Sequence, residues 1–291
     1  MIRMRSLVRL QLAPRHRPSR DETLPTTAPG ALRRDRGGRH LARRWWRQTA
    51  RHHQARRLAR LHAAQIGSLM RVLGVIPARG GSKAIPGKNL VELGGKPLIK
   101  WTLEAAKSSM LDRVVVSTDD EKIAAYCVEQ GTEVPFRRPE EISTDRAQTI
   151  DAVIHAVDFL GEYYDAVMLL QPTTPFRSPD DIDRCIQMLD SSDADSVISV
   201  VDVAGHHPAR MKFLEDGILI DPPFSEAVEN QPRQELRPMF IRNGAVYLTR
   251  IDTLRMRSFK GQKCLGFVMP VERSINIDDM SDLKIARAML T

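Results

Sequence analysis

The chain has 291 residues and a formal charge of +8, but this charge is spread very unevenly. Seventeen arginines against three acids give residues 1–70 a formal charge of +14, so the rest of the chain carries −6. Three widely spaced cysteines without a Cys-x-x-Cys pair argue against a disulfide framework or a zinc site, and no apolar run reaches the length of a membrane span. We therefore expect a soluble, cytoplasmic protein with reduced thiols.

Residues 1–69 form an Arg-rich extension in which no hydrophobic period is sustained, so we expect disorder there. The arginine density and Trp45-Trp46 are compatible with a tail for nucleic acid or anionic membranes, and the scarcity of acids is compatible with a transit peptide. We favour a third interpretation, a translated leader upstream of a start at Met70. Met70 stands two residues before the first predicted strand, which thus opens at once after this methionine.

From residue 72 onward, strands and helices alternate, which predicts an α/β fold with a mostly parallel sheet. The predicted strands are 72–76, 113–117, 133–136, 166–170 and 195–203. The predicted helices are 97–109, 120–130, 149–160 and 179–189, with a last one near 282–290. Because the carboxyl ends of parallel strands meet at one edge, the loops at Arg79, Ser117 and Gln171 should face one crevice.

Residues 204–240 interrupt the alternation with a series of turn signals, among them His206-His207-Pro208 and Asp216-Gly217. We interpret this stretch as an insertion that leaves the sheet. Adjacent histidines point in different directions in regular structure, and no third ligand accompanies them. We therefore expect His206 and His207 to be surface residues and not metal ligands.

The first predicted strand leads into a glycine-rich, cationic loop. Its residues are Arg79, Gly80, Gly81, Ser82, Lys83, Lys88 and Asn89. Glycines allow the backbone N–H groups to approach an anion closely, and the three cations add charge that persists at neutral pH. The spacing matches neither the Walker pattern nor the dinucleotide pattern. The loop therefore predicts a polyphosphate site of another type.

Residues 76–90 resemble the nucleotide-binding signature of the CMP-sugar synthetases, the cytidylyltransferases that activate sialic acids and related nonulosonic acids. Further blocks follow in the same order: 116–120, 170–177, 243–247 and 276–278. The resemblance implies a Rossmann-like fold of the nucleotide-diphospho-sugar transferase type over residues 70–291. It also implies transfer of CMP from CTP to the anomeric hydroxyl of the sugar acid, with release of pyrophosphate.

The matched motifs also imply roles for single residues. They place Arg79 and Lys88 on the triphosphate, line it with Gly80, Gly81 and Ser82, and put Asn89 near the ribose. Arg138 matches a position in the nucleotide pocket, although a surface charge is an equally good interpretation, and Gln171 matches a residue that binds the sugar.

Two arginines are candidates for binding the carboxylate of the sugar acid. Arg233, with Gln234, matches a recurring pair in the insertion, and Arg242 precedes the turn at 243–245. A planar, bidentate guanidinium suits a carboxylate in either place, so the choice stays open.

For the metal, the resemblance implies Mg²⁺ at Asn276 and Asp278. Positions two apart in an extended segment point the same way, so both side chains could share one ion. Many relatives carry Asp at both positions, and the uncharged Asn276 predicts weaker Mg²⁺ binding here. The alternative is that Asp278 only caps the last helix.

The turn Pro172-Thr173-Thr174-Pro175 replaces the acidic Gly-Asp-Glu-Pro turn typical of synthetases for the eight-carbon acid KDO. This favours the nine-carbon, sialic-acid-like branch, and the resemblance also implies a homodimer formed through the insertion. Two other hypotheses remain: a CTP-binding homologue without catalysis, and a nucleic-acid-binding protein acting through residues 1–69. The negative charge of the remainder argues against the second.

Overall fold

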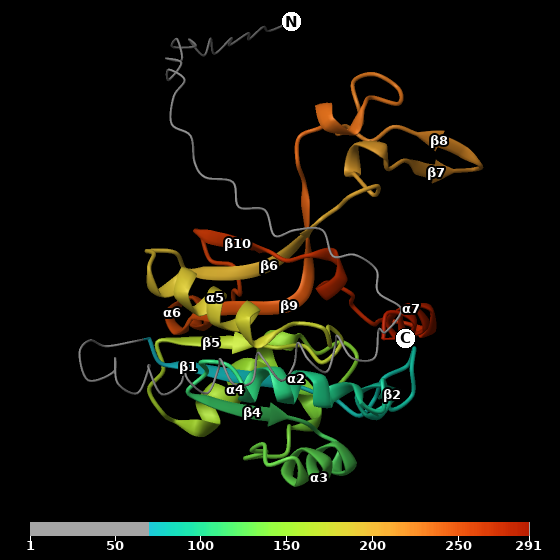
Figure 1. Cartoon of the computed structure of the whole chain (residues 1–291). Helices are drawn as coiled ribbons and strands as arrows, with labels where there is room; N and C mark the ends of the chain where they lie inside the picture. The colour runs from blue at the N-terminus through green and yellow to red at the C-terminus, as the bar shows by residue number, and fades with distance from the viewer. Residues whose placement is uncertain (1–69, 291) are drawn as a thin grey trace, which may run out of the picture. The chain divides into compact units, whose positions relative to one another are not determined.

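The computed structural model describes residues 70–290, and the predictions for residues 1–69 lie outside this range. Its centre is a six-stranded sheet with the order β10-β6-β9-β5-β1-β4 (Figure 1). The strands are β1 (Val72–Pro77), β4 (Arg113–Ser117), β5 (Ala166–Leu169), β6 (Ser196–Asp202), β9 (Phe240–Arg250) and β10 (Cys264–Val268). The helices are α2 (Leu98–Lys107), α3 (Glu121–Glu129), α4 (Thr149–Leu160), α5 (Pro179–Asp190), α6 (Ile251–Arg255) and α7 (Met280–Ala288).

The sheet is mostly parallel, which confirms the predicted fold class. β1 pairs in parallel with β4 and β5, and β10 pairs in parallel with β6. β9 is the exception, since it lies between β5 and β6 and runs antiparallel to both. The carboxyl ends of β1, β4 and β5 therefore lie at the same edge of the sheet, as predicted for the loops that follow them.

Helices cover both faces of the sheet, and β1 contributes to both cores. Val72 and Ile76 pack with residues of α2 and α5 in one cluster, whereas Leu73 and Val75 pack with residues of α4 in another. This alternation follows from the two-residue period of a strand. Because helices cover both faces of the sheet, the side chains of β1 are apolar on both faces.

One predicted strand is wrong. Residues 133–136 form no strand of the sheet and contribute a single isolated bridge, between Val115 and Glu133. Pro135 lies in the middle of this stretch and has no N–H group to donate to a ladder, so the pairing cannot be extended through it.

Residues 203–239, here called the arm, leave the sheet after β6 and return at β9 (Figure 1). The arm carries a separate hairpin of β7 (Phe213–Glu215) and β8 (Ile218–Ile220), turned at Asp216 and Gly217, both of which have positive φ. His207 is buried, so the prediction of a surface residue is wrong for it. Its Nδ1 accepts from the Ala209 N–H (3.1 Å), and its Nε2 lies 2.9 Å from the Arg237 carbonyl, which joins the two legs of the arm.

Short elements complete the chain between these larger ones. They are β2 (Glu92–Leu93), β3 (Lys96–Pro97) and the 3-10 turns at Lys88–Leu90, Glu140–Ile142, Pro208–Arg210, Arg233–Glu235 and Val271–Arg273. Within residues 70–290, no helix is both long and apolar enough to cross a membrane.

Candidate active site

The loop after β1, residues 79–89, is here called the phosphate loop, and two side-chain contacts hold its shape. The Gly80 N–H donates to Asp119 Oδ1 (3.0 Å), which ties the loop to the end of β4. Asn89 is buried, and its Nδ2 donates to the Arg79 carbonyl (3.0 Å), so the amide spans the loop from end to end. The Ser82 N–H closes a tight turn onto the Gly80 carbonyl (3.0 Å).

The two glycines of the loop serve different purposes. A Cβ on Gly80 would lie 2.6 Å from Asp120 Oδ2 and 2.9 Å from Asp120 Cβ. Asp120 cannot give way easily, because its carboxylate caps α3 by accepting from the Lys122 and Ile123 N–H groups. Gly81 has no described atom within 4 Å of the equivalent position. Gly80 is therefore required by packing, and Gly81 leaves the backbone open to a ligand.

The loop cations already have partners within the chain. Arg79 Nη1 donates to Asp145 (2.8 Å), and Lys83 pairs with the other oxygen of the same carboxylate. The hydrogen bond from Lys83, with the nearby charges of both cations, holds the pKa of Asp145 below its usual range. A triphosphate that binds Arg79 and Lys83 must therefore compete with Asp145.

Lys88 joins the phosphate loop to the segment before α7. Its ammonium donates to the Ile277 carbonyl (3.0 Å) and lies 3.7 Å from Asp278 Oδ1. Two residues that are 190 positions apart in the chain are thus brought together at one point.

Arg138 is buried, which excludes the interpretation as a surface charge. Its Nε donates to the Ser117 hydroxyl (3.0 Å) and its Nη2 to the Ser117 carbonyl, so it supports the end of β4. Burial lowers the pKa of Arg138 to about 10, although the Asp119 carboxylate opposes the shift. The guanidinium therefore stays protonated at neutral pH, close to the residues that hold the phosphate loop.

A second group of side chains gathers around Gly244, near the start of β9. Gly244 has φ +79°, and a Cβ there would lie 2.9 Å from Gln171 Oε1, 3.1 Å from Thr174 Oγ1 and 3.7 Å from Asn276 Oδ1. These three oxygens come from two segments that are distant in sequence, and together with Gly244 they form what we call the acceptor cluster.

Two buried residues that the sequence patterns did not single out as site residues hold the acceptor cluster in place. Arg177 is fully buried and donates to the Ala245 carbonyl (2.8 Å), to Thr102 Oγ1 (2.7 Å) and to the Gln171 carbonyl. Burial lowers its pKa to about 9, so it remains a cation at neutral pH. Asn243 Nδ2 donates to Ser274 Oγ (2.9 Å), and Asn243 Oδ1 accepts from Ser199 Oγ (2.6 Å).

The Asn276 and Asp278 side chains contact each other directly. Asn276 Nδ2 donates to Asp278 Oδ2 (2.6 Å). The alternative that Asp278 caps the last helix is wrong, because Asp279 is the N-cap residue of α7 and accepts from the Ser281 and Asp282 N–H groups. The Asp278 side chain is instead 70% exposed.

As a metal site, this pair is incomplete by itself. Within residues 70–290, no group of three or more His, Cys, Asp or Glu side chains could hold an ion. Mg²⁺ nevertheless often binds through one or two carboxylates, with waters and substrate phosphates completing the shell. An exposed carboxylate near the phosphate loop fits such a site.

Arg233 lies apart from these groups. It is on the arm, and its guanidinium pairs with Asp202 at the end of β6 (3.0 Å). Among the described residues, no hydrogen bond or ion pair joins Arg233 to the phosphate loop or to the acceptor cluster. Arg242 is exposed at the start of β9, two residues before Gly244.

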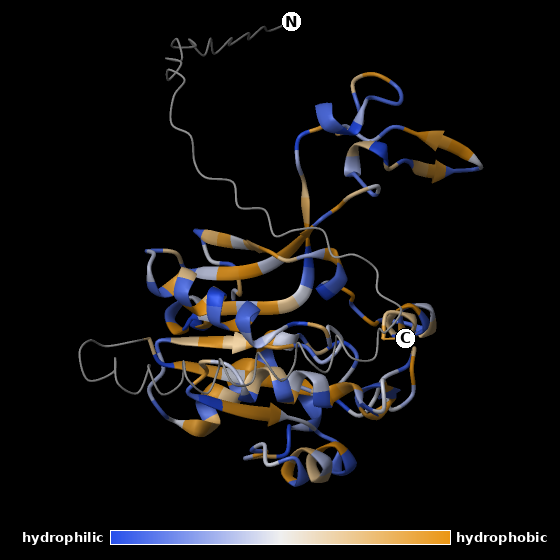
Figure 2. Cartoon of the chain, viewed as in Figure 1, coloured by the Kyte–Doolittle hydropathy of each residue, from blue (hydrophilic) through white to orange (hydrophobic). Residues whose placement is uncertain are grey.

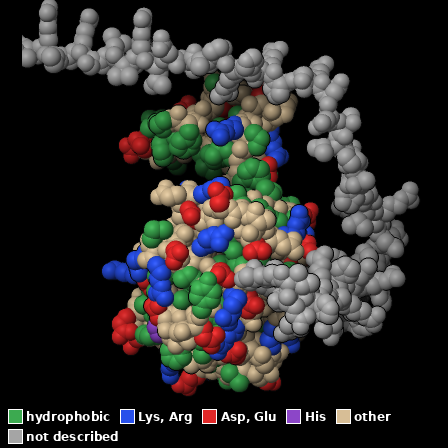
Figure 3. All heavy atoms as spheres, turned by 90° about the vertical axis from the view of Figure 1, so that its left-hand side faces the viewer, with side chains coloured by type: hydrophobic (Ala, Val, Ile, Leu, Met, Phe, Trp, Pro, Cys, Tyr) green, Lys and Arg blue, Asp and Glu red, His purple; other side chains and the backbone are tan. Residues whose placement is uncertain are grey.

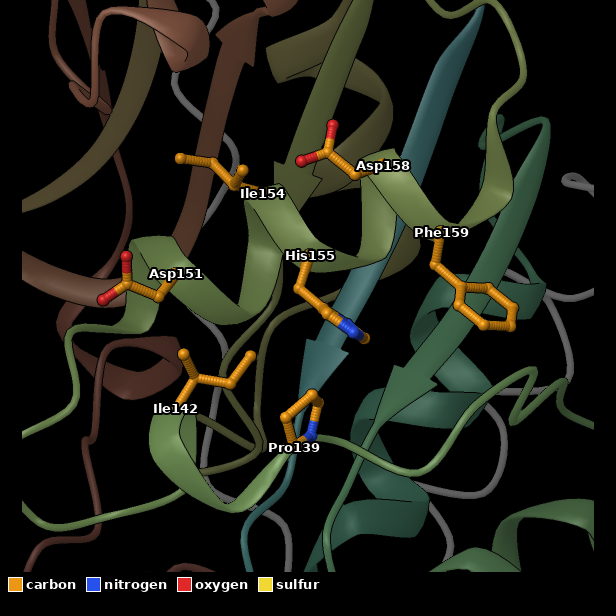
Figure 4. A pocket seen from close by; sticks show the side chains of 7 residues that line it. All are labelled: Pro139, Ile142, Asp151, Ile154, His155, Asp158 and Phe159. Carbon is orange, nitrogen blue, oxygen red and sulfur yellow. The ribbon is translucent and has the colours of Figure 1, made fainter.

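Figure 4 shows a separate hollow on the outer face of α4. It is lined by Pro139, Ile142, Asp151, Ile154, His155, Asp158 and Phe159. None of the predicted site residues lines it. Its two carboxylates, moreover, already pair with Arg257 and Arg255. The hollow is therefore distinct from the candidate active site.

Comparison with known proteins gives the family. Residues 73–223 match the family model described as cytidylyltransferase. The chain belongs to this family. The resemblance inferred from the sequence blocks is thus confirmed, and the phosphate loop lies within the matched region.

Two relatives show how much of the chain is shared. N-acylneuraminate cytidylyltransferase of Streptococcus agalactiae serotype V is 36% identical over 219 residues, which cover 73% of this chain and 52% of that protein. The chain thus spans about half the length of this relative. CMP-N,N'-diacetyllegionaminic acid synthase of Legionella pneumophila is 34% identical over 227 residues, which cover 76% of this chain and 97% of that protein.

A solved structure of CMP:2-keto-3-deoxy-manno-octonic acid synthetase in complex with CTP has a similar fold. The TM-score is 0.57 at 19% identity, and the match covers 76% of this chain and 98% of the other. At this level of identity, the likeness supports the α/β architecture alone.

Proposed function

We propose that this chain transfers CMP from CTP to the anomeric hydroxyl of a sialic-acid-like nonulosonic acid and releases pyrophosphate. The observation that carries the proposal is the link made by Lys88, which brings the phosphate loop against the Asp278 segment. The proposed site thereby combines cations for a triphosphate, a carboxylate for a metal and a cluster of acceptors for a sugar. Membership of the cytidylyltransferase family supports CTP as the nucleotide.

In the proposed reaction, the anomeric oxygen attacks the α-phosphorus, and the bond from that phosphorus to the pyrophosphate oxygen breaks. Phosphoryl-type transfer depends mainly on positioning and on neutralisation of charge. Arg79 and Lys83 would exchange Asp145 for the phosphates, and the open backbone at Gly81 would lie against them. Ser82 and Asn89 hold the loop in shape, and Arg138 adds a cation behind Ser117.

We propose Mg²⁺ as the cofactor, with Asp278 as its protein carboxylate. When bound, the ion would neutralise charge on the triphosphate and on the leaving pyrophosphate. The exposure of Asp278 and its closeness to Lys88 support this role, because a carboxylate at that place would face the same phosphates that we propose for the loop.

The acceptor is proposed to be a nine-carbon acid, bound at Gln171. The two relatives described above are named for N-acylneuraminate and N,N'-diacetyllegionaminate, which favours this branch over KDO. The turn Pro172-Thr173-Thr174-Pro175 also lacks the acidic residues typical of KDO synthetases. Arg233 and Arg242 remain the two candidates for the carboxylate of the sugar acid.

We further propose that a second copy of the chain covers the arm. The hairpin exposes Phe213, Leu214, Ile218 and Leu219, each more than half accessible. Figure 2 shows its strands in the colour of hydrophobic residues, and Figure 3 shows hydrophobic side chains on another face of the arm. An isolated two-stranded hairpin is marginally stable in water, so such a surface needs a partner. Sedimentation of the full chain at micromolar concentration should give a dimer mass, and Leu214→Asp should shift it to a monomer. A monomeric mass for the unaltered chain would refute the proposed dimer.

The cytoplasmic location predicted from the sequence is retained as a proposal. Cys127 and Cys185 are buried as free thiols, and burial raises the pKa of Cys127 to about 12, which keeps it protonated and unreactive.

The interpretation of residues 1–69 as a leader also remains a prediction. Mass spectrometry of the native amino terminus tests it, since peptides upstream of Met70 would refute it.

The proposed function is tested by an assay of pyrophosphate release. The full chain, CTP and Mg²⁺ are incubated with a panel that includes N-acetylneuraminate, legionaminate, pseudaminate and KDO. We expect release with at least one nine-carbon acid and none without a sugar. Release with KDO alone would favour the eight-carbon alternative, and binding of CTP without any release would identify a catalytically silent homologue.

A further inference from the structure

We propose that Asn276 belongs to the sugar-binding side of the site, where its carbonyl accepts a hydrogen bond from the substrate beside Gln171, and that it is not a metal ligand. The identity of the substrate in this inference rests on the proposed function. The assignment of Asn276 to one side of the site rests on its own contacts.

The orientation of the Asn276 amide is set by its neighbour. Nδ2 donates to Asp278 Oδ2 at 2.6 Å. Turning the amide over would place Oδ1 against the carboxylate, two acceptors with no hydrogen between them. The hydrogen-bond chemistry therefore requires Nδ2 toward Asp278 and Oδ1 away from it.

The Oδ1 atom that faces away is buried, yet it accepts no hydrogen bond from any residue between 70 and 290. Buried polar atoms in proteins nearly always have a partner, and an exception calls for an explanation. The other buried amide near this point shows the contrast, because Asn243 uses both its oxygen and its nitrogen within the chain. We infer that a hydrogen-bond donor of the bound substrate is the missing partner of Asn276 Oδ1.

The position of Oδ1 indicates what kind of group that donor is. The space left by the missing Cβ of Gly244 is bordered by Gln171 Oε1, Thr174 Oγ1 and Asn276 Oδ1. The Thr174 hydroxyl donates its own hydrogen to the Asn243 carbonyl (3.2 Å), so it also faces this space as an acceptor. The two acceptors whose roles are set by their own hydrogen bonds, Thr174 Oγ1 and Asn276 Oδ1, favour neutral donors, such as the hydroxyl or amide N–H groups of an N-acylated sugar. They disfavour the carboxylate of the sugar acid, which we therefore assign to another part of the site.

The hydrogen bond between Asn276 and Asp278 lies at the boundary between the proposed metal site and the proposed sugar site. On one side, Asp278 Oδ1 lies 3.7 Å from Lys88 Nζ and faces the phosphate loop. On the other side, Asn276 Oδ1 faces Gln171 across Gly244. A single carboxylate thus remains for the metal, and the amide next to it serves the sugar.

The decisive variant is Asn276→Ala in the full chain, with two readouts that separate the two roles. We expect the KM for the sugar acid to rise about tenfold or more, since an acceptor of a substrate hydrogen bond is lost. The affinity for Mn²⁺, titrated into the protein alone and followed by electron paramagnetic resonance, should stay within about twofold of the unaltered protein. A tenfold loss of Mn²⁺ affinity would overturn the inference and return Asn276 to the metal site.

A second variant approaches the same space from the backbone and removes no polar group. In Gly244→Ala, the new Cβ would press on Gln171 Oε1 and approach Asn276 Oδ1, so we expect a raised KM for the sugar acid and an unchanged Mn²⁺ affinity. Gly95→Ala is the matched control, because Gly95 has φ +80°, close to the φ of Gly244, but has no described atom within 4 Å of a Cβ. Equal sugar KM values in these two variants would count against the inference.

The Mn²⁺ titration also keeps this inference separate from the proposed function. It needs neither CTP nor turnover, so it can place Asn276 on or off the metal site in a protein that releases no pyrophosphate. Failure of the unaltered chain to release pyrophosphate would count against the proposed function, whereas loss of Mn²⁺ binding in Asn276→Ala would count against this inference alone.

Discussion

The two ends of the candidate site differ in how their polar groups are satisfied. At the phosphate end, Arg79 and Lys83 share the carboxylate of Asp145, so both cations already have an anionic partner within the chain, and one positive charge remains unbalanced. At the acceptor end, the groups are uncharged, and Asn276 Oδ1 is buried with no donor among residues 70–290. The first end is therefore suited to exchange one anion for another, and the second is suited to receive a neutral ligand that supplies hydrogens.

The largest effect is expected where the two ends meet. Asp278→Ala should lower kcat by about a thousandfold or more, because it removes the only carboxylate that we assign to the metal. The fold should be unaffected, since Asp278 does not cap α7. Asp279→Ala is the matched control: it removes the capping box and should lower the free energy of unfolding by about 1 kcal/mol with turnover largely retained. Near-normal turnover in Asp278→Ala would remove this residue from the mechanism.

The next effect tests the shape of the phosphate end. Gly80→Ala should raise the KM for CTP by about tenfold or more, because the new Cβ meets Asp120 and must displace the loop. Gly81→Ala should change it by less than about threefold, since nothing described lies near that position. Steady-state kinetics with varied CTP give both values. Equal effects would mean that the loop is not held as described.

A smaller effect tests the exchange of anions. Asp145→Asn should bind CTP several-fold more tightly at low salt, because the triphosphate no longer competes with a carboxylate, and high salt should reduce the difference. Asp158→Asn, which removes a carboxylate paired with Arg255, should leave CTP binding unchanged. Weaker CTP binding in Asp145→Asn would show instead that Asp145 holds Arg79 in its binding position.

The pH dependence of this difference follows from the lowered pKa of Asp145. A carboxyl group with a lowered pKa is still ionised at the pH where an ordinary carboxyl group begins to gain its proton. It becomes protonated only at a lower pH. The difference in CTP affinity between the unaltered chain and Asp145→Asn should therefore be constant between about pH 6 and pH 8. Titration calorimetry at several pH values measures it, and a difference that disappears by pH 6 would contradict the pairing.

The smallest effect tests the support of the acceptor end. Thr102→Val deprives the buried Arg177 of one acceptor, so the free energy of unfolding should fall by about 1–2 kcal/mol and the KM for the sugar acid should rise about twofold to threefold. Thr132→Val is the matched control, because the Thr132 hydroxyl is buried without a hydrogen-bond partner in the described part of the chain, so its loss should be close to neutral. Denaturant unfolding and sugar kinetics on both variants decide the point.

The same contrast explains what could be predicted from the sequence. The phosphate loop is continuous in the chain and follows one apolar strand, so its residue types, spacing and position at the sheet edge were all visible. The strand at 113–117 and the helix at 149–160 were predicted with the bounds that the structure has, because each is a short periodic run between clear turn signals.

The acceptor end could not be assembled in this way. Gln171, Gly244 and Asn276 meet only because β9 returns from the arm and runs antiparallel between β5 and β6, and no local pattern encodes that pairing. Burial was equally hidden. Arg177 is the fully buried cation of this region, yet a surface position is the ordinary expectation for an arginine.

The central claim is that the chain joins CMP to a sugar acid, and the fate of the α-phosphate tests it most directly. The full chain is incubated with Mg²⁺, CTP labelled with ³²P at the α-phosphate, and the nine-carbon acid that gives the most pyrophosphate. We predict that the label moves into a CMP-sugar whose mass is that of CMP plus the acid less one water. Label that remains in CTP, or that appears only in free CMP, would contradict the account.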